Sequence, residues 1–209
     1  MKNYVPTSQG PLFFDLKELK QKPLSRDQSK ENLLDARQIL SNSKVTWGII
    51  YGTLLGAIRE SDFIAHDTDT DIFVFEEQRQ SVLDSLPVFL SKGFEIARYE
   101  KVILSIIRNE EYIDFYFFKK SPKGRRAGNL FAPQIFFSGQ GVARMCGIEI
   151  PTVANPEEFL RCTYGQSWNV PIAGRHAEPH PIWWKRVIEK LFPEITKRIG
   201  TLTNRPKKL

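Results

Sequence analysis

Three aspartates stand at alternate positions, Asp67, Asp69 and Asp71, and lead directly into the apolar run Ile72–Phe75. Side chains two residues apart in an extended chain share a face, so these carboxylates are predicted to point the same way at the start of a buried strand. Like charges on one face repel one another and are costly to desolvate. The segment is therefore either a solvated acidic turn or the wall of a site that holds a positive charge.

The rest of the chain predicts a fold in which helices and strands mix. Ser25 followed by Gln28 is typical of a capping box at the start of a helix. Periodicity predicts helices over residues 26–41, 53–60, 77–92 and 156–164 and strands over residues 45–52, 71–75, 94–100, 102–109 and 111–118. Residues 121–156 are rich in glycine and proline and are predicted to be mostly loop. This order indicates an α+β (mixed α/β) fold, with a small mixed sheet flanked by helices.

Composition limits the cellular setting. No run of 18 apolar residues occurs, and the first residues lack the order of a secretory signal, so no membrane-spanning helix or leader is expected. The only cysteines are Cys146 and Cys162, which favours a reducing compartment, the cytoplasm, without a disulfide framework or a cysteine-based zinc site.

The net charge of +6 and the pI of about 9.3 favour anionic partners, among them nucleotides, phosphorylated glycans, nucleic acid or an acidic membrane surface. The positive charge is concentrated in residues 119–126 and in the tail from Trp184 onward. Both stretches can also be plain solvated surface. We predict an N-terminal arm over residues 1–24, a catalytic domain over 25–180 and a basic helical tail over 181–209.

A fourth acid, Asp114, lies in the apolar run YIDFYFF. Burying it is unfavourable unless a charged group meets it. In one interpretation Asp114 is a structural acid paired with Arg98 or Arg108. In the other it joins Asp69 and Asp71 in a carboxylate site for Mg²⁺ or Mn²⁺, hard cations that prefer oxygen ligands.

A possible phosphate site precedes the acids. Gly52 and Thr53 stand where the strand over residues 45–52 turns into a helix, and backbone N–H groups at a helix start bind phosphate well. One Gly-Thr step is weak evidence by itself, but its position directly upstream of an acidic row favours a site that binds metal and phosphate together.

Two stretches resemble a known family. YGTLLGAIRESDFIAHDTDTDIFV, residues 51–74, is similar to the signature of the LicD/fukutin family of the nucleotidyltransferase-fold superfamily, and GIEIPTVANPEEFLRCTYGQSW, residues 147–168, resembles its closing motif. The resemblance covers about residues 45–170. The sequence departs from the family pattern at Ala65, His66 and Thr68, which replace a proline, a tryptophan and an aspartate.

The resemblance implies a nucleotidyltransferase-like fold and a metal-dependent transferase. Such an enzyme moves a phosphate-linked small alcohol, phosphocholine or a related phosphoalcohol, from a CDP-linked donor to a hydroxyl of a cell-surface glycan or its precursor and releases CMP. The expected cofactor is Mg²⁺ or Mn²⁺, and no zinc is expected because the cysteine cluster of some animal members is missing. The expected partners are the donor and the glycan acceptor rather than nucleic acid.

The roles of individual residues follow from this resemblance. Asp69 and Asp71, with Asp67, are expected to hold the metal, while Asp114 either completes the coordination or takes the proton from the attacking hydroxyl. The expected substrate-binding residues are Gly52, Thr53, Arg59, Arg125, Tyr164 and Trp168. Arg59 can instead be a plain surface residue, and Tyr164 and Trp168 can instead be core aromatics.

Two other functions remain open at this point. The same acids on the same fold serve nucleotidyltransferases that attach an NMP to a small molecule, tRNA or protein. A non-catalytic protein can use the basic stretches to bind nucleic acid, but it gains little from carboxylates that face phosphate.

The basic tail and its two tryptophans also suggest peripheral contact with an anionic membrane surface, at the inner face of the membrane.

Overall fold

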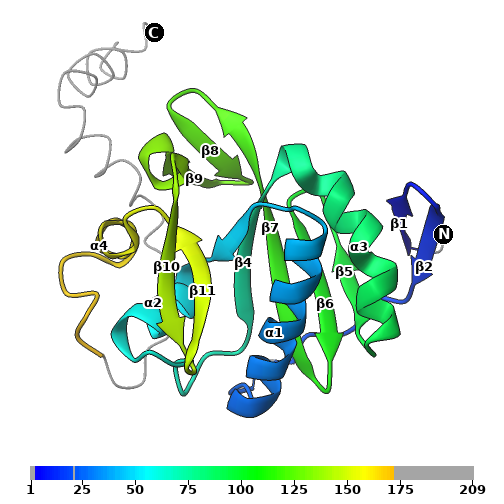
Figure 1. Cartoon of the computed structure of the whole chain (residues 1–209), viewed down its shortest axis with the longest axis horizontal. Helices are drawn as coiled ribbons and strands as arrows, with labels where there is room; N and C mark the ends of the chain where they lie inside the picture. Colours follow the sequence, from blue (N-terminus) through cyan, green and yellow to red (C-terminus); the bar gives the residue numbers. More distant parts are fainter. Residues whose placement is uncertain (1–2, 21, 172–209) are drawn as a thin grey trace, which may run out of the picture.

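The computed structural model describes residues 3–20 and 22–171 (Figure 1). The predicted basic helical tail, residues 181–209, lies outside the described residues, as do residues 172–180 at the end of the predicted domain. Within the described part of the chain, no helix combines the length and the apolar character needed to cross a membrane.

A nine-stranded mixed sheet forms the centre of the fold (Figure 1). Its main path runs β10-β11-β3-β4-β7-β6-β5. Off this path, β8 pairs with the C-terminal end of β7, and β9 pairs with β8. The strands are β3 Trp47–Ile49, β4 Thr70–Phe75, β5 Glu95–Tyr99, β6 Ile103–Arg108, β7 Glu111–Ser121, β8 Gly124–Ala127, β9 Leu130–Pro133, β10 Gln140–Met145 and β11 Ile148–Val153. The pairs β4/β7 and β11/β3 are parallel and the others antiparallel, so the sheet is mixed as predicted.

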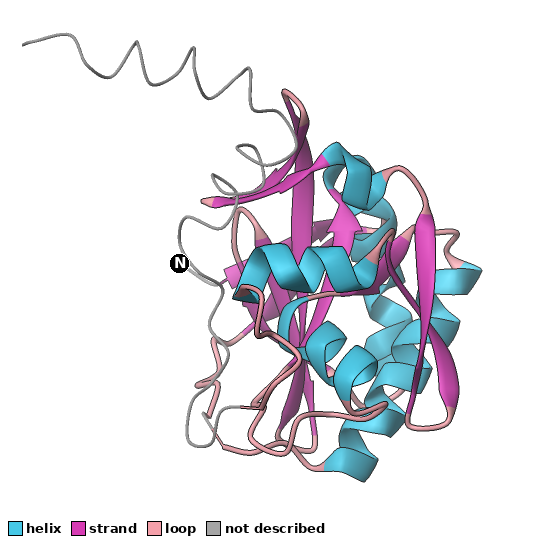
Figure 2. Ribbon diagram, turned by 90° about the vertical axis from the view of Figure 1, so that its left-hand side faces the viewer, coloured by secondary structure: helices cyan, strands magenta, loops and turns pink. Residues whose placement is uncertain are grey.

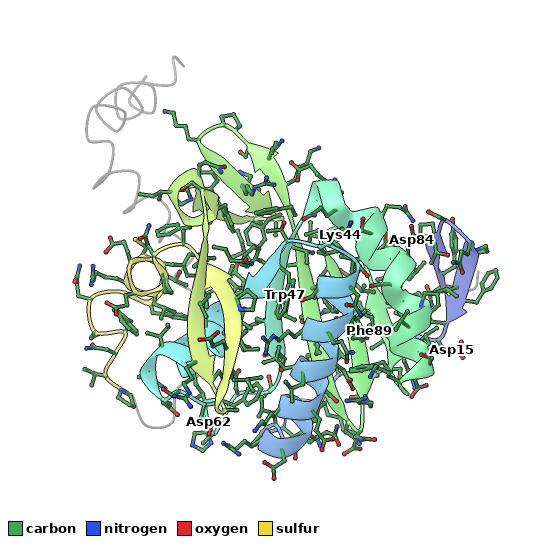
Figure 3. All side chains as sticks on the ribbon, in the orientation of Figure 1. Asp15, Lys44, Trp47, Asp62, Asp84 and Phe89 are labelled. Carbon is green, nitrogen blue, oxygen red and sulfur yellow. The ribbon has the colours of Figure 1, made fainter. Side chains whose placement is uncertain are left out.

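In the described part of the chain, four α-helices flank this sheet: α1 Arg26–Asn42, α2 Tyr51–Arg59, α3 Arg79–Ser91 and α4 Pro156–Tyr164. Short 3-10 helices cover Glu76–Gln78 (η1) and Gln134–Phe137 (η2). Helices α1 and α3 lie side by side (Figure 1), whereas α2 packs against α4, β4 and β10. Buried Trp47 and Phe89, labelled in Figure 3, belong to one continuous core that joins β3 to α3.

The register of β7 assigns the helices to opposite faces of the sheet. Successive strand residues point to opposite faces. Phe115 packs on Phe89 of α3 at 5.9 Å between ring centroids, whereas its neighbour Tyr116 packs on Tyr51 of α2 at 5.4 Å. Asp114 has the parity of Tyr116, so its carboxylate lies on the α2 face (Figure 2 shows helices on both sides of the strands).

The predicted fold class, a mixed sheet flanked by helices, is confirmed, and all four predicted helices are present. The capping box is wrong: Ser25 is the N-cap of α1 but makes no side-chain capping bond. Gln28 instead donates to Asn32 at 3.0 Å, one turn further along the helix.

The N-terminal arm predicted over residues 1–24 contains a hairpin that the sequence did not indicate. β1 Asn3–Thr7 and β2 Gly10–Phe14 form a separate antiparallel hairpin, at the blue end of Figure 1. Ser8 in its turn donates from its backbone N and from Oγ to Asp84 of α3, at 2.6 and 2.7 Å. Pro6 and Pro11 lie opposite each other in this hairpin. Because proline in sheets is largely confined to edge strands, two prolines in one short stretch argued against strands in the sequence.

The loop-rich interpretation of residues 121–156 is also wrong, because this segment contains β8, β9, β10 and β11. Gly128 and Gly147 lie at hairpin turns, whereas Gly124 and Gly141 lie within strands. Between β10 and β11, Cys146 and Gly147 both have positive φ, 50° and 81°, the two-residue turn that matches the twist of paired strands. This glycine therefore marks a point where the chain reverses between paired strands.

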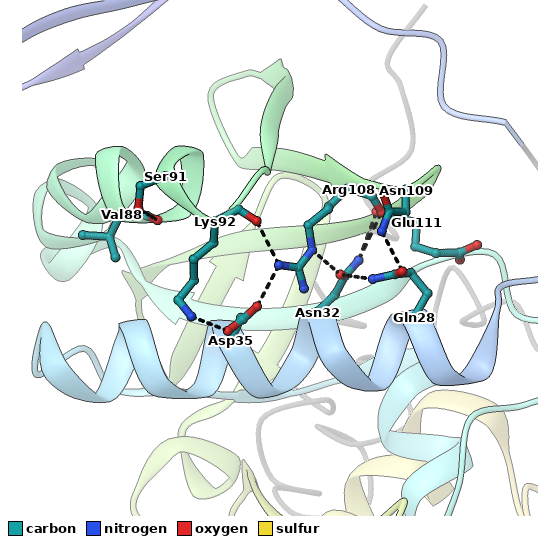
Figure 4. A network of polar contacts seen from close by, with 9 residues as sticks. All are labelled: Gln28, Asn32, Asp35, Val88, Ser91, Lys92, Arg108, Asn109 and Glu111. Atoms are coloured by element: carbon teal, nitrogen blue, oxygen red, sulfur yellow. Dashed lines mark hydrogen bonds and ion pairs between the residues drawn. The ribbon is translucent and has the colours of Figure 1, made fainter.

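A polar network ties α1 to α3 and to the end of β6 (Figure 4). Asp35 accepts hydrogen bonds from Lys92 Nζ and Arg108 Nη1, each at 2.7 Å. Arg108 Nε also donates to Asn32 Oδ1 at 2.8 Å. Burial would raise the pKa of Asp35, but the hydrogen bonds from Lys92 and Arg108 prevail and hold this pKa below its usual range.

Replacing Asp35 with asparagine is expected to lower the free energy of unfolding at neutral pH by about 1 kcal/mol, since the partly exposed carboxylate loses two ion pairs. The native pKa lies below the unfolded value of about 3.9, so the contribution is present above that value and disappears as the pH falls through the native pKa. Urea unfolding of both proteins at neutral and acidic pH measures this. Asp27→Asn is the control, since Asp27 is 89% exposed. An equal cost at both pH values would contradict the electrostatic origin.

Candidate active site

The site begins at the turn from β3 into α2. Tyr51, the first residue of α2, adopts a left-handed backbone conformation with φ 50°. The next residue, Gly52, donates its backbone N–H to Asp71 Oδ2 at 3.3 Å. The start of α2 is thus directed at the acidic start of β4, and the helix dipole favours negative charge there.

Gly52 leaves room for another of the acids. A Cβ built on Gly52 would stand 2.7 Å from Asp67 Oδ2 and 3.1 Å from Asp67 Oδ1. The first distance is shorter than real contacts allow and the second is tight, so the Asp67 carboxylate occupies the space that any larger residue would fill. The glycine of the predicted phosphate-binding step therefore makes room for a carboxylate in this structure.

We expect Gly52→Ala to reduce metal affinity and turnover by about tenfold or more, because the methyl group displaces the Asp67 carboxylate from the start of α2. The fold should persist, since alanine favours a helix by up to about 1 kcal/mol over glycine and a carboxylate can move aside. Gly139→Ala is the matched control, as its Cβ would meet nothing closer than 4.0 Å. Equal loss of turnover in the two variants would refute the role assigned to Gly52.

The pairing of strands brings the acids together. In the parallel pair β4/β7, Asp71 stands directly beside Asp114. Ser105 of β6 is the next neighbour of Asp114, and Arg98 of β5 is the next neighbour of Ser105. One lateral row across four adjacent strands therefore reads Asp71, Asp114, Ser105, Arg98.

The carboxylates influence one another electrostatically. Burial, and after it the negative charges of Asp67 and Asp114, raises the pKa of Asp69 to about 7. Burial, and after it the charges of Asp69, Asp67 and Asp114, holds the pKa of Asp71 well above its usual range. Full ionisation of the cluster is therefore unfavourable unless a positive charge lies beside it, which is the condition under which a bound cation is most favourable.

Asp114 is held on both oxygens. Oδ1 accepts a short hydrogen bond from Ser105 Oγ, and Oδ2 accepts from Arg98 Nη2 at 3.1 Å. Arg98 Nε also donates to Ser105 Oγ at 3.1 Å. Of the two arginines considered as partners, Arg98 therefore pairs with Asp114, while Arg108 belongs to the network around Asp35.

The chemistry of the acids fits a hard divalent cation, since carboxylate oxygens are its preferred ligands and these four acids lie close enough to shift one another's pKa values. In the described residues, no three or more His, Cys, Asp or Glu side chains are arranged to hold a metal ion. The assignment of Asp67, Asp69, Asp71 and Asp114 as metal ligands stays a prediction.

Three tyrosines surround the acids on the α2 face. Burial, together with the nearby charge of Asp71, raises the pKa values of Tyr51, Tyr116 and Tyr164. The buried Tyr164 hydroxyl has no hydrogen-bond partner among the described residues. An unsatisfied buried hydroxyl is costly, so this group is available to a ligand that enters the site.

Sequence reasoning missed Tyr51, Tyr116 and Ser105, and it left open whether Arg98 or Arg108 pairs with Asp114. Tyr51 directly precedes Gly52, and Tyr116 stands two residues after Asp114, which in a strand means the same face. That spacing was a usable signal for Tyr116. For Ser105 and Arg98 the signal is the strand register alone.

Three predicted substrate-binding residues have other contacts. Thr53 is fully buried and its Oγ1 accepts the backbone N–H of Asp71 at 2.8 Å, so it holds β4 rather than a phosphate. Arg59 lies at the opposite end of α2 from Gly52 and pairs with Glu60. Arg125 stacks on Phe75 at 3.8 Å and binds Glu77 at 2.8 Å, at the end of β4 away from Asp71.

The aromatic pair of the closing motif lies at the core. Tyr164 ends α4, and both Tyr164 and Trp168 are partly buried against the core. For Tyr164 the structure records packing of the ring against the core, and its predicted contact with substrate stays a prediction. For Trp168 the structure records packing, and its predicted contact with substrate stays a prediction.

Comparison with known proteins identifies the segment that carries these acids. Residues 44–139 match the family described as LicD/FKTN/FKRP, nucleotidyltransferase domain. This segment belongs to the LicD/FKTN/FKRP family. The match includes Gly52 and all four acids of the site, and it ends before α4. The predicted family is thereby confirmed.

One curated relative is the uncharacterized protein RT0683 of Rickettsia typhi, 31% identical over 86 residues, which cover 41% of this chain. The match spans 27% of the length of that relative, about a quarter.

One of two similar solved structures supports the fold. The antibiotic-resistance factor ANT(2'')-Ia superposes with a TM-score of 0.51 at 13% identity, over 86% of this chain and 97% of that protein. A lincomycin-bound lincosamide antibiotic adenylyltransferase, LnuA, gives a TM-score of 0.47 at 13% identity, over 63% of this chain and 84% of that one. Together with the family, the first likeness confirms the predicted nucleotidyltransferase-like fold and carries nothing about substrates.

Proposed function

We propose that this LicD-family chain is a metal-dependent transferase of phosphate-linked groups. It moves a phosphoalcohol, phosphocholine or a relative of it, from a CDP-linked donor to a hydroxyl of a glycan and releases CMP. The observation that carries this proposal is the pairing of Asp71 with Asp114 beside the start of α2, within the segment that belongs to the family.

The chain's own residues would divide the work as follows. Asp69 and Asp71, with Asp67 beside Gly52, would hold Mg²⁺ or Mn²⁺. A divalent ion bound there supplies positive charge to a diphosphate as the nucleotide leaves. Asp114 would either join the coordination or accept the proton of the attacking hydroxyl.

The aromatic residues of the closing motif would bind the donor. The Tyr164 hydroxyl, buried and without a hydrogen-bond partner among the described residues, is suited to donate to a phosphate oxygen. Trp168 would offer an aromatic face to cytosine or to a quaternary ammonium. Thr53, Arg59 and Arg125 have no part in this proposal, because their observed contacts are structural.

Incubation of the full chain with CDP-choline, CDP-ribitol, CDP-glycerol or CDP-ethanolamine and Mg²⁺ tests the proposal, with CMP as the measured product. We expect one donor to be selected, to raise the melting temperature in the presence of metal and to yield CMP when acceptor glycan is added. The competing function, transfer of an NMP from an NTP, would instead release pyrophosphate. Pyrophosphate release from an NTP, with no response to any CDP-linked compound, would overturn the proposal.

A further inference from the structure

Arg98 stands at the edge of the acidic cluster and has no role in the proposed function. It lies on β5, which forms the outer edge of the sheet's main path. Two strands separate it from β4, yet its guanidinium reaches across Ser105 to Asp114 Oδ2 at 3.1 Å. A positively charged side chain therefore binds the carboxylate of Asp114, the residue that stands beside Asp71.

The local backbone aims Arg98 at this position. The pairing of β5 with β6 shifts register between Ile96 and Arg98, and such bulges re-aim the side chains of a strand. The Arg98 side chain keeps 31% exposure, whereas the Asp114 side chain is only 5% exposed. Arg98 can therefore turn away without unpacking the core, while Asp114 stays in place.

Arg98 brings a positive charge to the row of acids. Its guanidinium holds Asp114, which stands directly beside Asp71. In the protein without metal, Arg98 acts as the counter-ion of the cluster. It also keeps one oxygen of Asp114 from a divalent ion, so the two cations compete for the same carboxylate.

We propose that Arg98 is a positioning residue that changes partners. Without metal it binds Asp114. When a divalent ion joins Asp69 and Asp71, Arg98 releases Asp114 and turns to a phosphate oxygen of the donor. The planar guanidinium suits this exchange because its paired N–H donors can bind two oxygens of a carboxylate or of a phosphate. The inference rests on the proposed metal-dependent function.

The first measurement uses Mn²⁺ alone, followed by electron paramagnetic resonance. Arg98→Gln is expected to bind Mn²⁺ about fivefold more tightly than the wild type, because an ion pair worth about 1 kcal/mol no longer competes. In an Asp114→Asn background the same substitution should give no gain. This double-mutant cycle shows whether the gain in Mn²⁺ affinity comes from freeing the Asp114 carboxylate or from removing a positive charge in general.

The second measurement uses CDP with Mg²⁺, followed by calorimetry. Arg98→Gln is expected to bind CDP about tenfold more weakly, because a charged hydrogen bond to phosphate is lost. Arg98→Lys keeps the positive charge but lacks the paired N–H donors of the guanidinium, so its affinity for CDP should lie between those of the wild type and Arg98→Gln. This variant also provides the test in the case that Arg98→Gln folds poorly. Arg108→Gln, an arginine paired away from the acids, is the matched control and should change neither affinity.

Opposite changes in the two affinities support the exchange, since a merely structural role would weaken both. Wild-type protein that binds no Mn²⁺ would overturn the proposed function and this inference together. Wild-type protein that binds Mn²⁺ no less tightly than Arg98→Gln, or CDP affinity that is unchanged in Arg98→Gln, would overturn this inference alone.

Discussion

Replacing Asp71 with asparagine is expected to reduce turnover by about 10³-fold or more, a loss of about 4 kcal/mol of transition-state stabilisation. Asp71 is 6% exposed, stands beside Asp114 and accepts the N–H of Gly52, so it occupies the centre of the site. An amide keeps the hydrogen-bond acceptor but removes the charge that a cation requires. The variant should remain folded, and without metal it should be at least as stable as the wild type, because charge repulsion in the cluster falls.

Steady-state release of CMP and thermal unfolding of the metal-free protein measure the two effects. Asp84→Asn is the control, since Asp84 binds the N-terminal hairpin on the outer side of α3 (labelled in Figure 3) and should leave turnover unchanged. Metal-dependent turnover at the wild-type level in Asp71→Asn would show that the site lies elsewhere.

Replacing Phe159 with alanine is expected to lower the free energy of unfolding by about 3–5 kcal/mol. The side chain is fully buried and meets Phe136 edge to face at 5.3 Å and Tyr51 at 6.2 Å. It therefore fastens α4, which lies beyond the segment matched to the family, onto the start of α2. Turnover should also fall, because Tyr164 at the end of α4 is no longer held against the acids.

Guanidinium unfolding of Phe159→Ala and of the control Ile135→Ala measures this effect. Ile135 is 47% exposed, so its truncation should stay within about 0.5 kcal/mol of the wild type. A cost below about 1 kcal/mol for Phe159→Ala would mean that α4 is not part of the common core.

The helices and the β3–α2–β4 order could be read from the sequence because each depends on local periodicity and on residues close in the chain. The hairpins over residues 121–156 could not, since their glycines and prolines also suit loops. Pairing with β7 and with β3 decides that these residues form strands, and pairing depends on distant parts of the chain.

The same distinction holds in the site. The alternation of Asp67, Asp69 and Asp71 predicted a shared face, and Asp114 was correctly singled out as a buried acid that needs a charged partner. Which arginine it meets follows only from the lateral row through Ser105 to Arg98. Arg59 and Arg125 were chosen as basic residues near the motifs. Arg59, however, is separated from the acids by the length of α2, and Arg125 by the length of β4.

Crystals grown with Mn²⁺ and examined by anomalous diffraction test the central claim most directly. An anomalous peak bound by carboxylate oxygens of Asp69 and Asp71, at the start of α2, is the predicted result. A Mn²⁺ peak at another place in the protein, with both of these carboxylates turned away from it, would contradict the account.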